Sequence, residues 1–183
     1  MSKESADKEQ KRSFKREAFS WIACLVVTIL LTEFILNFVI INANIPSGSM
    51  ENTIMTNDKL IALRTSYWFN DPKRGDIIIF KYPDDETEWF IKRVIALPGE
   101  TVLVKDGKVY INGSKKALSE PYIKEEPVED FVPYKVPKNG YFVMGDNRNN
   151  SNDAREWETH YVSRDEVLGK AWFRYYPSIK VIK

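Results

Sequence analysis

Two serines lie in a short turn-forming sequence, IPSGSM, at residues 45–50. Pro46 and Gly48 favour a sharp turn that presents the hydroxyls of Ser47 and Ser49 together with free backbone N–H groups. A serine hydroxyl is a nucleophile for acyl transfer only when a base activates it. Turns of this kind are also common on protein surfaces, so the turn alone does not establish a catalytic site.

Lys92 is the candidate base. It lies in the apolar sequence WFIKRVIAL, residues 89–97, which has the composition of a strand. Because successive strand side chains point to opposite faces, Lys92 shares a face with Phe90, Val94 and Ala96. Burial there would lower the pKa of the lysine and leave a neutral amine able to accept a serine proton. The alternative is an edge-strand lysine whose amine stays in water, and periodicity alone favours that alternative.

A polar loop is the third candidate element. The sequence GDNRNNSNDAR, residues 145–155, follows an apolar strand. Its Asp and Asn content is compatible with Ca²⁺ binding, but it lacks the central Gly and closing Glu of an EF-hand loop, and its arginines oppose a cation. Asp–Arg pairs joined by bidentate hydrogen bonds fit the composition better. The sequence therefore predicts no metal site.

The rest of the composition excludes several classes of site. The lone Cys24 lies in an apolar segment, so the chain forms no internal disulfide and no cysteine-based metal site. His160 is the only histidine and lies in a polar loop without a motif, so we expect no catalytic role for it. A formal net charge of +1 excludes a strong general attraction to nucleic acid.

An apolar segment precedes all of these residues. No charge occurs from Ala18 to Thr32, and the apolar character continues after Glu33 to Ile41. At about 1.5 Å per residue, this stretch is long enough for a helix to cross a hydrocarbon layer of about 30 Å. A cleaved signal peptide and a buried soluble helix are the alternatives, but the segment is too long for the first and apolar on too many faces for the second. We place Glu33 near the outer interface, where it reaches water.

The charges around this segment predict its orientation. Four basic residues lie between positions 11 and 16, and the next Lys or Arg is Lys59. The positive-inside tendency then makes residues 1–17 a cytoplasmic tail and residues 18–41 a transmembrane helix. Residues 42–183 form an extracytoplasmic domain in this interpretation.

Beyond residue 42 the chain has the pattern of a mostly β, antiparallel domain. Short apolar or alternating runs are separated by Gly, Pro and Asp, with hardly any helical periodicity. Asp106-Gly107 predicts a small β-hairpin insert, and the Pro- and Glu-rich residues 119–138 predict an irregular excursion. The predicted strands are residues 76–82, 89–97, 101–105, 108–112, 140–144 and 171–175.

These elements, in this order behind an apolar segment, resemble the type I signal peptidase family of Ser-Lys peptidases. The resemblance covers nearly all of the chain from Ile45 to Pro177, and the short 119–138 excursion is most similar to the compact forms of Gram-positive-type bacteria. The matching stretches are residues 46–50, residues 74–76 with the strand that follows, residues 92–100, and residues 145–155 followed by Gly169-Lys170-Ala171.

The resemblance implies roles for individual residues. It makes Ser49 the acylating nucleophile and Lys92 the general base, and it places the Ser47 hydroxyl beside the Ser49 backbone N–H in the oxyanion hole. Supporting roles around the lysine are implied for Asp146, Ser151, Asp153 and Arg155. Ser151 would orient the amine. The loop departs from the family pattern at Asn149, where many members have Asp, and at Ala154, where many have Ser.

The implied function is a serine endopeptidase that removes signal peptides from translocated precursors after small residues, in an A-x-A pattern. Its expected partners are signal peptides and the lipid bilayer, with no nucleic acid, metal or other cofactor, and its expected location is the cell membrane. The rivals are a non-catalytic homologue that assists assembly of secreted polymers, a Ser-Lys self-cleaving regulator, and an anchored β-domain that binds a ligand. The first would lack Ser49 or Lys92, and the second normally carries a DNA-binding domain.

Overall fold

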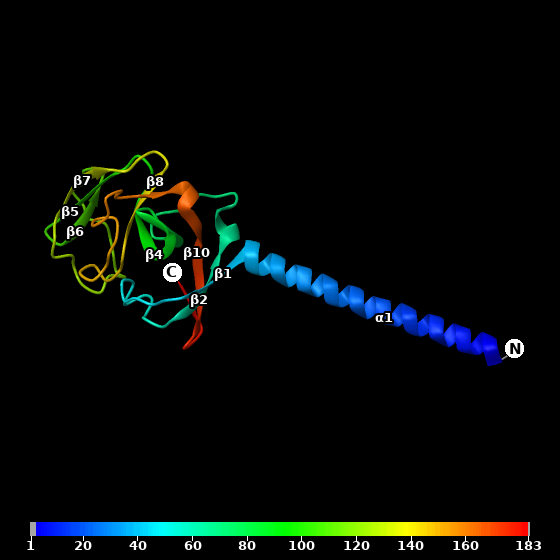
Figure 1. Ribbon diagram of the computed structural model, residues 1–183. Helices are drawn as coiled ribbons and strands as arrows, with labels where there is room; N and C mark the ends of the chain where they lie inside the picture. Colours follow the sequence, from blue (N-terminus) through cyan, green and yellow to red (C-terminus); the bar gives the residue numbers. More distant parts are fainter. Residues whose placement is uncertain (1–2, 183) are drawn as a thin grey trace. The chain divides into compact units, whose positions relative to one another are not determined.

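The computed structural model describes residues 3–182, with side chains described from Arg16 onward. It divides into a helical unit that ends at Val39 and a β-rich unit that begins at Ile40. Figure 1 shows the elements of both units along the chain.

The helical unit consists of α1 (Lys3–Phe34) and the π-helical η1 (Ile35–Val39). Within it, Arg16–Val39 is long and apolar enough to cross a membrane, by length and composition. The Glu33 carboxylate accepts a hydrogen bond from Asn37 Nδ2 at 3.1 Å. The predicted helix end at residue 41 is wrong, because residues 40–41 already pair with another strand.

The β-rich unit contains short strands and two 3₁₀ turns, η2 (Arg64–Tyr67) and η3 (Arg164–Glu166). The strands are β1 (Ile40–Asn44), β2 (Lys59–Leu63), β3 (Ile77–Tyr82), β4 (Asp85–Ala96), β5 (Thr101–Lys105), β6 (Lys108–Ile111), β7 (Phe131–Lys135), β8 (Gly140–Met144), β9 (Val162–Ser163), β10 (Val167–Tyr176) and β11 (Lys180–Val181).

The strands form two antiparallel sheets. The larger has the order β1-β2-β10-β3-β4-β8-β9, with β11 also paired to β10, and the smaller has the order β6-β5-β7. The smaller sheet lies at one end of the β-rich unit in Figure 1, with β1, β2 and β10 toward the other. β4 pairs with β3, where Lys92 is opposite Ile78, and with β8 from Arg93 onward, so Lys92 lies where β4 enters the interior of the larger sheet.

β3 separates the two apolar clusters that form the core of the β-rich unit. Ile78 and Phe80 pack into one apolar cluster, whereas Ile77 and Ile79 pack into a second cluster on the opposite side. Both faces of β3 are therefore buried, which accounts for its unbroken apolar sequence. In β4, the neighbour of β3, residues 92–96 are buried, whereas residues 85–89 are exposed.

The prediction of a mostly antiparallel β-protein with one apolar N-terminal helix is confirmed. Each predicted strand is present: residues 101–105 and 140–144 have the predicted limits, and the others differ by one to four residues at their ends. The prediction that residues 119–138 are wholly irregular is wrong, because Phe131–Lys135 forms β7 and pairs with β5. β7 is a largely exposed edge strand that contains Pro133, so it lacks the apolar alternation of an inner strand. The short strands β1, β2, β9 and β11 were also not predicted.

Candidate active site

The turn that carries Ser49 is held by its neighbours in the sequence. The side chain of Met50 is fully buried in the second apolar cluster, together with Ile54. The Glu51 N–H donates to the Gly48 carbonyl oxygen at 3.1 Å and closes the turn. An apolar anchor directly after the serine therefore fixes the backbone while the Ser49 hydroxyl faces a cavity.

Lys92 is buried, with 4% of its surface exposed, and its Nζ lies 2.7 Å from Ser49 Oγ. Burial lowers the pKa of Lys92 to about 8, and the negative charge of Asp153 opposes part of that effect. The Phe90 ring, 5.3 Å from Nζ, forms part of the apolar wall. The alternative of an edge lysine with its amine in water is wrong, because pairing with β8 makes β4 an inner strand.

Asp153 would hold the Lys92 amine in its charged form if its own charge were uncompensated. Arg155 compensates it: Nε and Nη2 donate to the two carboxylate oxygens of Asp153 at 2.9 and 3.0 Å. The Gly145 N–H donates to the same carboxylate at 2.9 Å. The pair therefore shapes the loop beside Lys92 while limiting the field at the amine.

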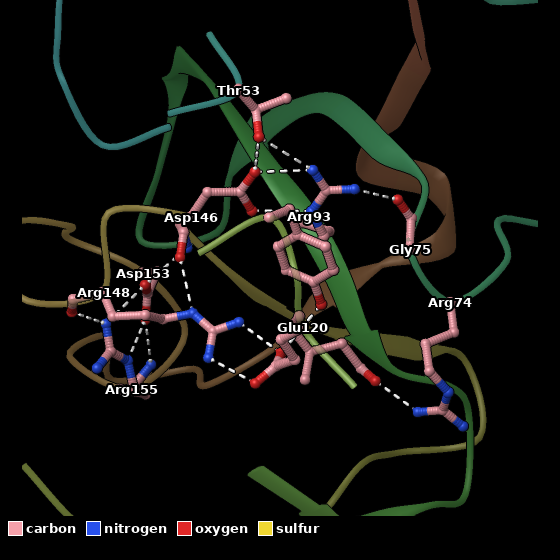
Figure 2. A network of polar contacts seen from close by, with 12 residues as sticks. Thr53, Arg74, Gly75, Arg93, Glu120, Asp146, Arg148, Asp153 and Arg155 are labelled. Carbon is pink, nitrogen blue, oxygen red and sulfur yellow. Dashed lines mark hydrogen bonds and ion pairs between the residues drawn. The ribbon is translucent and has the colours of Figure 1, made fainter. Parts of the chain in front are cut away.

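Asp146 and Arg93 form a second bidentate pair, with Nε and Nη2 of Arg93 donating to Asp146 at 2.8 and 2.7 Å. Figure 2 shows this pair with Thr53, whose hydroxyl also donates to Asp146, and with Gly75, whose carbonyl accepts from Arg93. Both charged side chains are almost completely buried. Because Arg93 follows Lys92 and Thr53 lies just after Ser49, this pair joins all three candidate elements.

Sequence reasoning missed the role of Asn147. Its N–H donates to the Ser49 carbonyl oxygen at 3.0 Å, and its Nδ2 donates to the Gly48 carbonyl oxygen at 3.0 Å. Asn147 thereby ties the polar loop to the backbone of the serine turn. Its place in the loop sequence was visible, but its partners lie far away in the chain.

The two other predicted serines differ in their surroundings. Ser47 is exposed and lines the cavity beside Ser49. Ser151 Oγ is buried and has no hydrogen-bond partner among residues 3–182, so the predicted contact with the Lys92 amine is absent from the structure. In the same described part of the chain, no group accepts a hydrogen bond from the Ser49 N–H, which leaves this donor available to a ligand.

A cavity of about 580 Å³ opens above Ser49 and Lys92. A second, more apolar cavity of about 230 Å³ adjoins it along β1 and β4 and shares Pro46, Trp89, Phe90 and Ile91 with it. β1 lies at an edge of the larger sheet. The two adjoining cavities form a trough, which is bordered by the edge strand β1 and contains the Ser49 hydroxyl and the Lys92 amine.

The remaining predicted residues have packing roles. Asn149 joins the loop to the 119–138 excursion, because it accepts from the Val128 N–H at 2.9 Å and donates to the Glu126 carbonyl oxygen at 3.0 Å. Ala154 is fully buried, and its carbonyl oxygen lies 2.7 Å from His160 Nδ1. The His160 ring packs against two aromatic rings of β7.

A metal centre finds no support in the residues that the structure describes. Between residues 16 and 182, no group of three His, Cys, Asp or Glu side chains is arranged to hold an ion. The two aspartates of the polar loop are instead engaged by Arg93 and Arg155.

Comparison with known proteins agrees with this arrangement. The family model described as "Signal peptidase, peptidase S26" matches residues 18–176. The chain belongs to this family. The match includes the apolar part of the helix from residue 18, the serine turn, β4 and the polar loop, so the whole candidate site lies within it.

Individual members of the signal peptidase family match over most of their length. A "Probable signal peptidase I-2" of Synechocystis is 43% identical over 86% of this chain and 72% of that protein. A "Signal peptidase I" of Bacillus licheniformis is 34% identical over 96% of this chain and 97% of that protein. A crystal structure of a signal peptidase I from Enterococcus faecalis has 36% identity and a TM-score of 0.48, over 55% of this chain and 97% of that one. The predicted resemblance to the family, including its compact Bacillus forms, is confirmed.

Proposed function

We propose that this peptidase is a membrane-anchored serine endopeptidase that removes signal peptides from exported precursors, with Ser49 as nucleophile and Lys92 as general base. The observation that carries the proposal is the 2.7 Å contact between Lys92 Nζ and Ser49 Oγ in a buried setting. With a pKa of about 8, Lys92 is neutral in about one molecule in ten at pH 7, whereas a solvated lysine is almost entirely charged there. The family of the chain supports the same reaction.

The reaction proceeds by acyl transfer. The neutral Lys92 amine takes the proton of Ser49 as Oγ attacks the scissile carbonyl carbon. The developing oxyanion accepts hydrogen bonds from the Ser49 N–H and the Ser47 hydroxyl. The Lys92 ammonium then gives its proton to the departing amine, which leaves an ester on Ser49. Lys92 finally deprotonates a water molecule that hydrolyses this ester and restores the free hydroxyl.

The trough beside the site is suited to an extended peptide. We place the residues before the scissile bond along the free edge of β1, where backbone hydrogen bonds add a strand and side chains enter the apolar cavity. The A-x-A pattern of signal peptides means that this cavity receives small side chains at the cleavage site. Helix Arg16–Val39 anchors the enzyme in the cell membrane, with the catalytic unit on the outer side.

The test is cleavage of a purified precursor by the full-length enzyme in phospholipid-containing detergent. Ser49→Ala and Lys92→Ala are each expected to lower kcat by at least about 10⁴-fold, and the double variant no further, because the pair acts as a unit. Lys81→Ala, which removes a lysine of the adjacent strand, is the control and should leave kcat unchanged. In the parent enzyme, kcat/KM should rise with pH around a midpoint near 8.

Retention of activity in Lys92→Ala would contradict this mechanism. Failure of the parent enzyme to cut any precursor would contradict the proposed function itself. Cleavage after large residues as readily as after small ones would contradict the substrate rule.

A further inference from the structure

Residues 119–124 of the excursion lie against the polar loop that supports the candidate site. Glu120 receives a fork of hydrogen bonds from Arg148, with Nη2 to Oε1 at 2.6 Å and Nη1 to Oε2 at 3.1 Å (Figure 2). The side chains are 6% and 0% exposed. Arg148 also donates through Nε to the Gly145 carbonyl oxygen at 3.0 Å. The ion pair therefore connects residues 119–124 to Gly145, at the beginning of the polar loop.

The same segment contacts β4. The Tyr122 ring lies beneath the Arg93 guanidinium, whose Cζ is 3.9 Å from the ring centre. The Tyr122 hydroxyl donates to Glu120 Oε1 at 3.0 Å. Since Arg93 directly follows Lys92, this stacked and hydrogen-bonded pair constrains the strand that presents the amine.

The segment also contacts the turn that presents the nucleophile. Asn52 Nδ2 donates to the Tyr122 carbonyl oxygen at 2.9 Å. Lys124 adds a surface ion pair with Glu51 at 3.1 Å, and its backbone N–H donates to the Asp146 carbonyl oxygen at 3.2 Å. Residues 119–124 thus touch all three elements that form the site.

Glu120 is the centre of these contacts. Its buried carboxylate accepts from both Arg148 and Tyr122, so its removal would leave a buried guanidinium without its partner and loosen the loop. A looser loop would also displace the serine turn, because the Asn147 N–H donates to the Ser49 carbonyl oxygen at 3.0 Å. A rearrangement of about 1 Å in such a site costs on the order of 100-fold in rate.

We propose that residues 119–124 are a positioning device for the reaction and that Glu120, through Arg148 and Tyr122, sets the separation between Ser49 Oγ and Lys92 Nζ. Glu120 touches neither substrate nor reacting atoms, so it is a positioning residue. This inference rests on the proposed peptidase function. It gives a positioning role to residues 119–124, which the sequence predicted only to be part of an irregular excursion.

The test compares Glu120→Gln, Glu120→Asp and the control Glu125→Gln in the full-length enzyme. Glu125 is an exposed carboxylate of the same excursion, so its substitution removes the same charge from a site outside the contact network. For Glu120→Gln we expect kcat to fall at least about tenfold with KM within about twofold, because geometry rather than substrate binding is lost. The midpoint of the pH profile should move to higher pH, since a looser loop admits water to Lys92. Glu120→Asp should recover part of the loss, and Glu125→Gln should match the parent.

The inference is wrong if folded Glu120→Gln has the kcat and the pH midpoint of the parent. It is also wrong if the midpoint of the pH profile is that of the parent and the loss of kcat in Glu120→Gln equals the fraction of that variant that thermal unfolding shows to be unfolded at the assay temperature. Should Glu120→Gln fail to fold, Tyr122→Phe removes only the hydroxyl that donates to Glu120. About threefold lower kcat with the same displacement of the midpoint supports the inference, and parental values contradict it. An inactive parent enzyme would instead contradict the proposed function.

Discussion

At the scale of single residues, the burial of Lys92 favours the neutral amine that the proposed reaction needs but lowers the stability of the fold. The folded chain encloses the Lys92 amine, and burial lowers its pKa by more than the charge of Asp153 raises it. The folded chain therefore binds fewer protons than the unfolded chain between about pH 8 and pH 10.5. The free energy of unfolding rises with pH through this window, and the cost of burying Lys92 is fully present below it.

Replacement of Lys92 by methionine should stabilise the fold at pH 7 while abolishing activity. The depression of the pKa from 10.5 to about 8 corresponds to about 3 kcal/mol. The lost hydrogen bond to Ser49 offsets part of this, so we expect a gain of about 1–3 kcal/mol at pH 7. The gain should shrink toward pH 10.5, and urea unfolding of the solubilised chain at both pH values measures it. A Lys92→Met variant less stable than the parent at pH 7 would show that the buried amine is better solvated than its surroundings indicate.

At the scale of elements, the site depends on how closely the end of β8 approaches the serine turn. Gly145, the first residue after β8, lies against the Ser49 carbonyl oxygen and the Ser151 hydroxyl. A Cβ at this position would lie under 3.0 Å from both, and the Ser49 oxygen belongs to the backbone and cannot rotate away. The absence of a side chain at residue 145 is therefore a condition for the Ser49–Lys92 contact.

Gly145→Ala should lower kcat by on the order of 100-fold, because it pushes the serine turn away from β4. The matched control is Gly169→Ala, whose added Cβ would clash with the Leu63 backbone at 2.8 Å inside the sheet. Both variants should unfold at lower temperature, but only Gly145→Ala should lose kcat per folded molecule. Equal kcat in the two folded variants would mean that the close approach of Gly145 is unimportant for the reaction.

At the scale of the whole molecule, one chain combines an apolar helix with a β-rich catalytic unit. The family match begins at residue 18 and therefore covers parts of both units of this chain. Basic residues at positions 11–16 precede the apolar part of the helix, and the next one in the chain is Lys59 in β2. This asymmetry predicts that the N-terminus stays in the cytoplasm.

A reporter that is active only after export should therefore be active when fused after Lys183 and inactive when fused before Met1. Replacing the basic residues at positions 11, 12, 15 and 16 with glutamine should weaken this preference, because the charge difference sets the orientation. Protease accessibility in spheroplasts provides the independent measurement. A catalytic unit that resists protease in confirmed spheroplasts would contradict the predicted orientation.

Local patterns in the sequence determined much of this protein. The apolar segment, the hairpin at Asp106-Gly107 and the β-rich class follow from composition and periodicity, which act over a few residues. The predicted roles of Ser49 and Lys92 came from the resemblance to the signal peptidase family, because the turn and the strand periodicity did not establish them alone. Strand limits were less accurate where pairing rather than composition decides them, as for Ile40–Asn44 and Phe131–Lys135.

Only the tertiary structure decided whether Lys92 is buried, because periodicity assigns a side chain to a face of a strand but not a strand to the interior of a sheet. The pairing of β4 with β8 supplies that information. Likewise, Glu120 and Arg148 are separated by 28 residues, and Asn147 bonds to the backbone at Ser49 and Gly48. Contacts at such separations depend on the path of the whole chain, which local patterns of polarity do not predict.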